Sequence, residues 1–315
     1  MGVPESSSFV KLSSLILIML LCMNAKSETP SRPVKYEIFS ATGQQQTYDD
    51  MIQTVEKSDI IFIGETHDNP VAHALELKVL ESLFKVQNSI ALSMEMFSCD
   101  VQPVVDEYLN GFISEKQFLA DARPWPNYQE AYRPLIMFCK SNSIPVLAAN
   151  VPRRYVNLVS REGMKSLLNL PEESRKFLPP IPYSMDIPSG YKQELDSIFG
   201  MPHDEAVEKE MHKSASSMPT TTHMIEAQAL WDDAMAHAIS KFHTLHPTLK
   251  ILQINGEMHS DHGWGIVDRL RRLQPKLRIT ILSVQPSEVW PISKSPSVNG
   301  VADYLILTVP VTKRS

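Results

Sequence analysis

Residues 59–67 read Asp-Ile-Ile-Phe-Ile-Gly-Glu-Thr-His, and residues 249–259 read Leu-Lys-Ile-Leu-Gln-Ile-Asn-Gly-Glu-Met-His. In both stretches an apolar run rich in β-branched or aromatic residues, which suits a buried strand, is followed by Gly-Glu-x-His. If the two strands lie parallel in one sheet, both tetrads emerge at its carboxyl edge, where open α/β sheets bind their ligands. The repeat therefore predicts an α/β fold in which two carboxylates and two imidazoles converge on one site.

Each tetrad combines backbone freedom with reactive side chains. The glycine permits an unusual turn and the close approach of a ligand, while the glutamate and the histidine supply acid–base or ligating groups. The alternative is that the glycine ends a strand and the polar residues are helix caps or surface groups. We predict that the site contains Glu65, His67, Glu257 and His259, and that His67 and His259 are the ligands if a divalent metal is bound.

Two further expected strands also end in polar residues. The strand over residues 89–94 is followed by Glu95, which we take as a third catalytic carboxylate rather than a solvated turn residue. The strand over residues 144–149 leads to Asn150 and to two arginines, of which Arg153 or Arg154 could hold an anionic group in a fork of hydrogen bonds. Paired arginines at a helix start can equally be solvated.

Strand and helix signals alternate along the chain, which predicts a mainly parallel sheet flanked by helices. Asn69 and Pro70 are favourable residues for starting a helix directly after the first tetrad, and the positive end of that helix would help to keep Glu65 ionised. Further helices are expected over residues 128–141 and 225–242. Two last strands are expected over 277–284 and 303–309.

Residues 162–222 differ from this alternation and read as a helical insertion. The insertion includes the proline-rich run 178–182 and carries tyrosine, methionine and histidine side chains suited to covering a flat apolar ligand, although each is individually more typical of a core. On the helix that follows, Gln228 and Asp232 are four residues apart and share a face. Cofactor contacts are expected from Asn150, Arg153, Tyr183, Tyr191, Gln228 and Asp232.

The N-terminal residues 1–27 have the features of a secretory signal peptide, because Lys11 precedes the apolar run 15–21 and small residues follow at Ala25 and Ser27. Residues 28–315 would then form a single domain in a secretory or extracytoplasmic compartment. A chloroplast transit peptide is the alternative. Lipidation at Cys22, which would associate the protein with a membrane, is disfavoured by the large Leu21.

Composition restricts the partners. The formal net charge of −6, without a long basic run, argues against nucleic acid, because phosphate neutralisation needs clustered lysine and arginine. Beyond residue 27 only Cys99 and Cys139 remain, and their spacing matches no zinc motif. A small molecule is the expected partner, and pairing of two subunits stays open.

These elements together resemble the ChaN-like family of haem-binding proteins, in the superfamily that includes Tiki metalloproteases and erythromycin esterases. The resemblance covers about residues 60–284. It rests on residues 63–68, 94–97 and 132–135, on the segment 144–153, on Gln228 with residues 231–232 and 235–236, and on residues 256–265. It implies a compact α/β fold with a helical subdomain, a polar pocket at the strand ends, and haem binding in some members, often in iron uptake.

The resemblance supports two functions. In the first, haem lies against the insertion with a tyrosine or histidine as axial ligand and an arginine near a propionate. In the second, the two Gly-Glu-x-His elements serve a hydrolase that uses a divalent metal or a general base. A structural or adaptor protein without a ligand is the third alternative.

Overall fold

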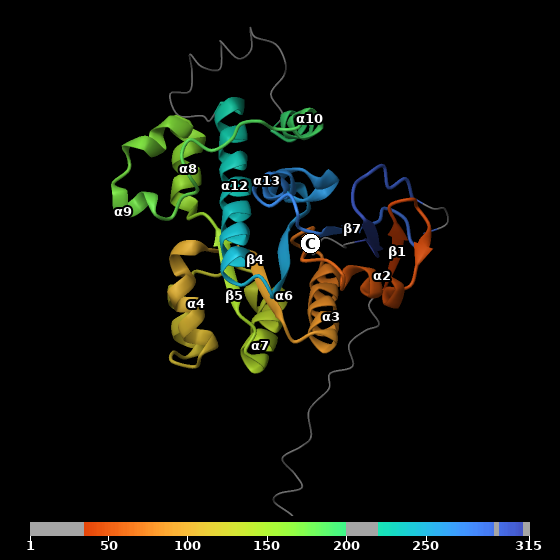
Figure 1. Ribbon diagram of the computed structural model, residues 1–315. Helices are drawn as coiled ribbons and strands as arrows, with labels where there is room; N and C mark the ends of the chain where they lie inside the picture. The colour runs from red at the N-terminus through yellow and green to blue at the C-terminus, as the bar shows by residue number, and fades with distance from the viewer. Residues whose placement is uncertain (1–34, 200–219, 293–295, 311–315) are drawn as a thin grey trace, which may run out of the picture. The chain divides into compact units, whose positions relative to one another are not determined.

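The computed structural model describes residues 35–199, 220–292 and 296–310 (Figure 1). The expected signal peptide and residues 200–219 of the expected insertion lie outside the described residues. The described residues between Lys35 and Ser315 belong to one compact unit. No helix in the described part of the chain is both long and apolar enough to cross a membrane.

The described residues form an eight-stranded mixed sheet. Its spatial order is β2 (Gln45–Gln46), β1 (Tyr36–Ser40), β8 (Tyr304–Thr308), β7 (Ile279–Pro286), β3 (Ile60–Glu65), β6 (Lys250–Gly256), β4 (Ile90–Ser98) and β5 (Val146–Asn150). Neighbours from β8 to β5 are parallel, whereas β1 and β2 extend the sheet antiparallel at one edge. The prediction of a mainly parallel α/β sheet is confirmed.

The two strands that carry the tetrads are direct neighbours. Glu65 of β3 pairs in register with Gly256 of β6, so both tetrads leave the sheet at the same edge and the same level. β4 lies on the other side of β6 and runs parallel to it. The carboxyl edge thus receives Glu65, Glu95 and Glu257 from three adjacent strands.

Helices cover both faces of the sheet. They are α2 (Tyr48–Val55), α3 (Pro70–Val86), α4 (Gln102–Leu109), α5 (Glu115–Asp121), α6 (Tyr128–Ala131), α7 (Arg133–Asn142), α8 (Arg153–Glu162), α9 (Glu172–Arg175), α10 (Ser189–Ile198), α12 (Thr221–Leu245) and α13 (Gly265–Leu273). Short 3₁₀ turns follow at Cys99–Val101, Met164–Asn169, Glu257–His259 and Asp261–Gly263.

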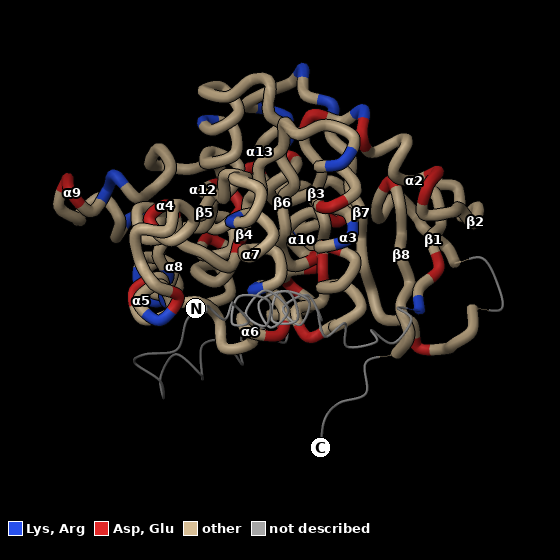
Figure 2. The backbone as a smooth tube through the Cα atoms, turned by 90° about the horizontal axis from the view of Figure 1, so that it is seen from below, with Lys and Arg blue, Asp and Glu red and all other residues tan. Residues whose placement is uncertain are grey.

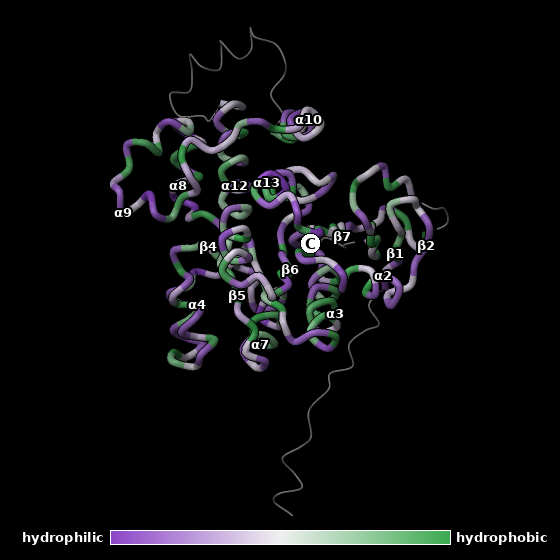
Figure 3. The backbone as a smooth tube through the Cα atoms, in the orientation of Figure 1, coloured by the Kyte–Doolittle hydropathy of each residue, from purple (hydrophilic) through white to green (hydrophobic). Residues whose placement is uncertain are grey.

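Alternate residues of β3 face opposite layers. Ile61 and Ile63 belong to the core that contains α3 and α7, whereas Ile60 and Phe62 belong to the core that contains α12 and α13. Hydrophobic segments are visible on α3, α7 and α12 in Figure 3. Burial on both faces explains why the strand is an uninterrupted apolar run rather than an alternating one.

Several expected boundaries differ from those observed. The helix expected over 128–141 is interrupted at Tyr132, because Pro134 in the first turn of α7 lacks the N–H that would continue one helix. The helix expected over 225–242 runs from Thr221 to Leu245. The short edge strands β1 and β2 and the helices α2, α4 and α5 were not predicted, since their apolar periodicity is short.

Candidate functional site

Glu65, the last residue of β3, lies at the centre of the site and is buried. Its Oε1 accepts a hydrogen bond from the Tyr132 hydroxyl at 2.5 Å and lies 3.0 Å from Nδ1 of His67. Its Oε2 lies 3.0 Å from Nε2 of His73. Burial alone would raise the pKa of Glu65, but the contacts with His67, His73 and Glu76 outweigh it and hold this pKa far below its usual range. Glu65 is therefore an ionised, buried carboxylate.

His67 connects the two tetrads. Its side chain is 42% exposed, and the ring of Trp125 meets it edge-on at 4.8 Å between centroids. A Cβ added to Gly256 would lie 2.8 Å from Nε2 of His67 and 3.7 Å from Oε2 of Glu95. Burial opposes the charged imidazole, yet Glu65 and Glu95 raise the pKa of His67 above its usual value. The histidine of the first tetrad thus lies against the glycine of the second.

A buried chain of polar groups leads away from Glu95. The Gly256 N–H donates to Oε2 of Glu95 at 2.8 Å, and Oε1 of Glu95 lies 3.6 Å from Nε2 of His259. On the other side of the ring, Nδ1 of His259 lies 2.6 Å from Oδ1 of Asp232, whose Oδ2 accepts from the Tyr191 hydroxyl at 3.0 Å. The order is carboxylate, imidazole, carboxylate, phenol.

The two carboxylates beside His259 determine its charge. Burial would lower the pKa of His259, but Glu95 and Asp232 together raise it to about 10. His259 is therefore a cation at neutral pH, and it neutralises two buried carboxylates instead of accepting a proton. Gln228, one turn before Asp232 on α12, completes the arrangement by donating to the Tyr191 hydroxyl at 3.1 Å.

Glu257 differs from the other carboxylates of the edge. Burial raises the pKa of Glu257 above its usual value, and the Thr66 hydroxyl donates to its Oε2 at 2.9 Å. The pKa of Glu95, although also buried, is lowered by His259 and His67. One edge of the sheet therefore offers an ionised carboxylate and one that retains its proton to higher pH. Acidic positions lie close to β3, β4 and α3 in Figure 2.

The structure brings most of the predicted residues together. Those that converge are Glu65, His67, Glu95, Glu257 and His259, with Asp232, Gln228 and Tyr191 behind His259. Asn150 instead binds the backbone, because its Nδ2 donates to the Glu95 carbonyl at 3.0 Å. Tyr183 donates to the Glu226 carbonyl at 2.8 Å and packs in the core formed by α8 and α12.

The two arginines have separate environments. Arg154 binds Asp100 at 2.7 Å and stacks over Tyr155. Arg153 is exposed at the first residue of α8, directly after β5, and its guanidinium has no ion pair within residues 35–199, 220–292 and 296–310. Of the two, Arg153 is the one free to meet an anionic ligand.

Sequence reasoning missed His73, Glu76 and Tyr132. His73 and Glu76 are one turn apart on α3, and Glu76 is buried beside the apolar Leu75 and Val79. An acidic residue among apolar neighbours of an amphipathic helix is a detectable signal, because charged groups are rarely buried without a partner. Tyr132 belongs to the segment 132–135 on which the family resemblance rests, but it was not predicted as a site residue, since a buried tyrosine is common.

The metal-ligand geometry differs from the predicted pair. Among the described residues, the group whose ligand atoms all lie within 4.8 Å of one another is Glu65, His73 and Glu76. His259 is not in it; its ring nitrogens lie 3.6 Å from Oε1 of Glu95 and 2.6 Å from Oδ1 of Asp232. The assignment of His67 and His259 as joint ligands does not follow from this structure.

The family whose model matches the chain is described as "Haem-binding uptake, Tiki superfamily, ChaN", and the match covers residues 51–270. Among solved structures, the chain is similar to one of cofacial haem binding to ChaN of Campylobacter jejuni, with a TM-score of 0.61 and 16% identity over 88% of this chain and 99% of that one. An erythromycin esterase mutant in its open conformation gives a TM-score of 0.45 and 12% identity over 88% and 83% of the two chains.

A curated relative is Protein RETICULATA-RELATED 5, chloroplastic, from Arabidopsis thaliana. It is 26% identical over 129 residues, which are 38% of this chain and 17% of that protein. The structural likeness to ChaN supports the fold, and the family match includes β3, β4, β5 and β6 with Glu65 at the end of β3, Glu95 within β4, which runs on to Ser98, and Glu257 directly after β6. By the extent of that match, the chain belongs to the ChaN-like haem-binding family of the Tiki superfamily.

Proposed function

We propose that this protein binds haem at the carboxyl edge of its sheet and takes part in haem or iron handling. The observation that carries the proposal is the family match over residues 51–270, which spans the strands that build the site. The haem-bound ChaN of Campylobacter jejuni, similar over 88% of this chain, provides the fold-level parallel.

A haem needs flat apolar cover, an axial ligand and a partner for its propionates. Half-buried tryptophans lie around the ends of β3 and β6: Trp125 against His67, Trp231 against His259, and Trp264 stacked with His262 at 4.3 Å. These rings are suited to packing against the flat face of a porphyrin, so this edge of the sheet offers the apolar contacts that a haem needs.

The axial ligand is better sought among imidazoles than phenols. Tyr183 and Tyr191, predicted as candidates, are buried and donate hydrogen bonds to Glu226 and Asp232, and either would have to give up this bond to reach an iron. Burial also raises the pKa of both phenols, which opposes phenolate formation. His67 and His262 are partly exposed, so we propose them as the first positions to test.

Arg153 is proposed as the propionate partner. It follows β5 at the carboxyl edge, and its guanidinium is free of ion pairs in the described part of the chain, whereas Arg154 is held by Asp100. A charge-assisted hydrogen bond of this kind contributes about 1.5 kcal/mol at a partly exposed position, or about tenfold in affinity.

The test is an absorbance titration of the purified protein with haem. We expect a saturable Soret shift near one haem per chain, with the Kd raised about tenfold by Arg153→Gln. Arg161→Gln, on the same helix, is the matched control. His67→Ala and His262→Ala should each be measured by the position of the Soret band. If the wild-type protein shows no saturable shift, haem binding is excluded.

A hydrolase is the second candidate and ranks lower. One observation supports it: the pKa values of Glu95 and Glu257 are displaced in opposite directions, which is how acid and base roles are divided between neighbouring carboxylates. Glu257 would donate a proton and Glu95 or His67 would orient water. The Glu257→Gln variant should then abolish ester or peptide hydrolysis and leave haem affinity unchanged. Equal turnover by the wild-type protein and the Glu257→Gln variant would exclude Glu257 as the proton donor.

We propose delivery to a secretory or extracytoplasmic compartment, with the chloroplast as the alternative. The apolar run 15–21 after Lys11 supports the secretory compartment. The chloroplast is supported by the name of the Arabidopsis relative, of which this chain covers 17%. Fusing residues 1–34 to a fluorescent reporter separates the two. Reporter retained in the cytosol would contradict both.

A further inference from the structure

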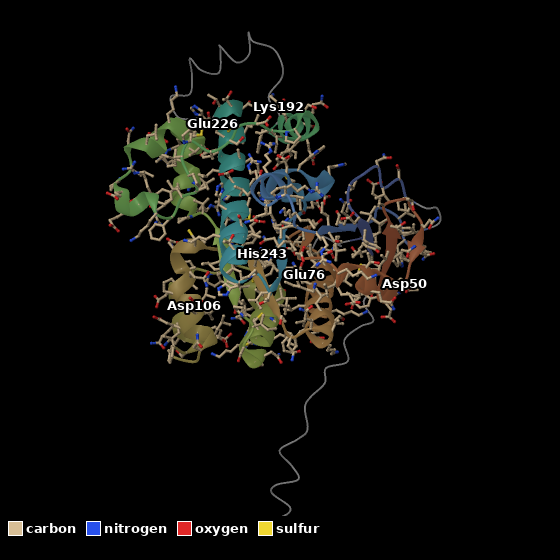
Figure 4. The ribbon with its side chains drawn as sticks, viewed as in Figure 1. Asp50, Glu76, Asp106, Lys192, Glu226 and His243 are labelled. Carbon is tan, nitrogen blue, oxygen red and sulfur yellow. The ribbon has the colours of Figure 1, made fainter. Side chains whose placement is uncertain are left out.

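Behind the site lies a second group of ligating atoms. Glu65 at the end of β3 meets two residues of α3, His73 in its first turn and Glu76 one turn later. One ligand atom from each residue lies within 4.8 Å of the other two, and Oε2 of Glu65 lies 3.0 Å from Nε2 of His73. Figure 4 labels Glu76 on α3, in the middle of the fold, and its side chain is buried.

The carboxylate of Glu76 lacks a hydrogen-bond partner. Both carboxylate oxygens of Glu76 have no hydrogen-bond partner among the described residues, whereas Oε2 of Glu65 and Nε2 of His73 form an ion pair at 3.0 Å. The side chain of Glu76 is fully buried, at 0% exposed. Leaving one buried polar atom unsatisfied costs about 1–3 kcal/mol, and two on one fully buried carboxylate indicate a missing partner.

The identity of the missing partner follows from the donor atoms. A proton shared between the two carboxylates would satisfy one oxygen of Glu76 and leave its other buried oxygen without a partner. A divalent cation satisfies all three residues and offsets both negative charges. Two ligand atoms on one ion with bonds of about 2.1 Å stand about 3.0–3.4 Å apart, which agrees with the 3.0 Å between Glu65 and His73.

The mixture of ligands restricts the ion. Mg²⁺ and Ca²⁺ prefer oxygen ligands alone, whereas an imidazole with two carboxylates suits Zn²⁺, Mn²⁺ or Fe²⁺. The side chain of His73 is 11% exposed and those of Glu65 and Glu76 are closed to solvent, so an ion would enter beside His73.

We propose that Glu65, His73 and Glu76 bind a divalent transition-metal ion, Zn²⁺ or Mn²⁺, at a site separate from the haem face. The ion ties the first turns of α3 to the end of β3. It also fixes Glu65, whose other oxygen contacts Nδ1 of His67 and accepts from the Tyr132 hydroxyl. The metal therefore positions His67 from behind without touching a ligand at the edge of the sheet.

The test uses the full-length protein, free of haem. Elemental analysis of the protein as isolated should find close to one zinc or manganese per chain. After chelation, adding ZnCl₂ or MnCl₂ should raise Tm by about 5 °C or more at a hundredfold excess over Kd, and MgCl₂ should not. Titration calorimetry gives the Kd directly.

Two variants locate the ion. Glu76→Gln keeps the shape of the side chain and can still donate to Glu65, so the apo protein should fold, while its metal Kd should rise about 100-fold or more. Glu81→Gln, on the same helix outside the group, should bind like wild type and serves as the matched control. His67→Ala should retain metal, because its ring contacts the other oxygen of Glu65.

Three results would overturn the proposal. One is a wild-type protein that carries no transition metal and shows no change in Tm with ZnCl₂ or MnCl₂ up to about 1 mM, on the order of the weakest specific affinities. Another is Glu76→Gln binding as tightly as wild type. The third is metal lost in His67→Ala and His259→Ala but kept in Glu76→Gln, which would move the ion to the edge of the sheet. Each readout is independent of haem.

Discussion

At the scale of single residues, the two tetrads pack against each other through their glycines. A Cβ on Gly64 would lie 2.8 Å from Oγ of Ser260 and 3.0 Å from Cα of Glu257, and a Cβ on Gly256 would lie 2.8 Å from Nε2 of His67. Each glycine therefore leaves room for residues that belong to the other tetrad or follow it. This reciprocal approach explains why both copies begin with the smallest residue.

The Gly256→Ala variant tests this packing. We expect a loss of about 1–3 kcal/mol in the free energy of unfolding, because the added methyl group displaces the His67 ring. In the background of His67→Ala the same substitution should cost clearly less, since the next neighbour, Oε2 of Glu95, is at an ordinary 3.7 Å. Urea unfolding of the four proteins of this cycle measures the coupling. Equal costs in both backgrounds would contradict the contact.

At the scale of elements, the start of α3 places His73 and Glu76 against β3. Asn69 caps this helix, since its Oδ1 accepts from the N–H groups of Val71 and Ala72. Its Nδ2 donates to the Thr308 hydroxyl of β8 at 2.9 Å. One buried side chain thus joins the start of α3 to the sheet.

We expect Asn69→Ala to lower the free energy of unfolding by about 2 kcal/mol, because both the cap and the bond to β8 are lost. Thr47→Ala is the matched control: Thr47 caps α2 at an exposed position and should cost about 1 kcal/mol or less. Thermal unfolding compares the two. The proposed metal should bind more weakly only in Asn69→Ala, because His73 lies in the helical turn that this residue caps.

At the scale of the whole molecule, the buried charges of the site make stability depend on pH. The pKa of His259 is about 10 when folded and near 6.5 when unfolded. Its stabilising contribution is complete below about pH 6.5 and is lost as pH rises through about 10, because the folded state binds the extra proton between these values. His259→Gln should remove this decline. Urea unfolding between about pH 6.5 and 10 measures it, and an unchanged slope in the variant would refute the cationic assignment.

Asp261 acts in an adjacent pH window. Burial raises its pKa to about 7, although Ser283 and Gln285 donate hydrogen bonds to it. A raised carboxyl pKa favours folding below about pH 4, and this contribution is lost as pH rises toward about 7, because the folded state holds the proton more tightly than the unfolded chain does. Asp261→Asn should flatten the stability curve between about pH 4 and 7, as measured by urea unfolding across that range. If the free energy of unfolding of Asp261→Asn depends on pH as steeply as that of wild type, the pKa of Asp261 is not raised by folding.

The sequence by itself determined the class of the fold and the centre of the site. Strands that are buried on both faces are continuous apolar runs in the sequence, and the residues that end a strand are its immediate neighbours along the chain. For this reason β3, β6 and the polar residues at their ends could be predicted from the pattern. The parallel pairing of these strands then followed from the general behaviour of α/β folds, and with it the meeting of Glu65, Glu95 and Glu257.

Only the tertiary structure decided which partner each group has. Contacts such as His259 with Asp232, or Glu65 with His73 and Glu76, join residues whose spacing along the chain carries no information about their approach. Such contacts decide the charge of His259 and the hydrogen bond from Tyr191 to Asp232. They also decide that Arg153 has no ion pair among the described residues. The physical reason is that burial and electrostatic pairing are properties of positions in space, and the chain reaches these positions only when the sheet has formed.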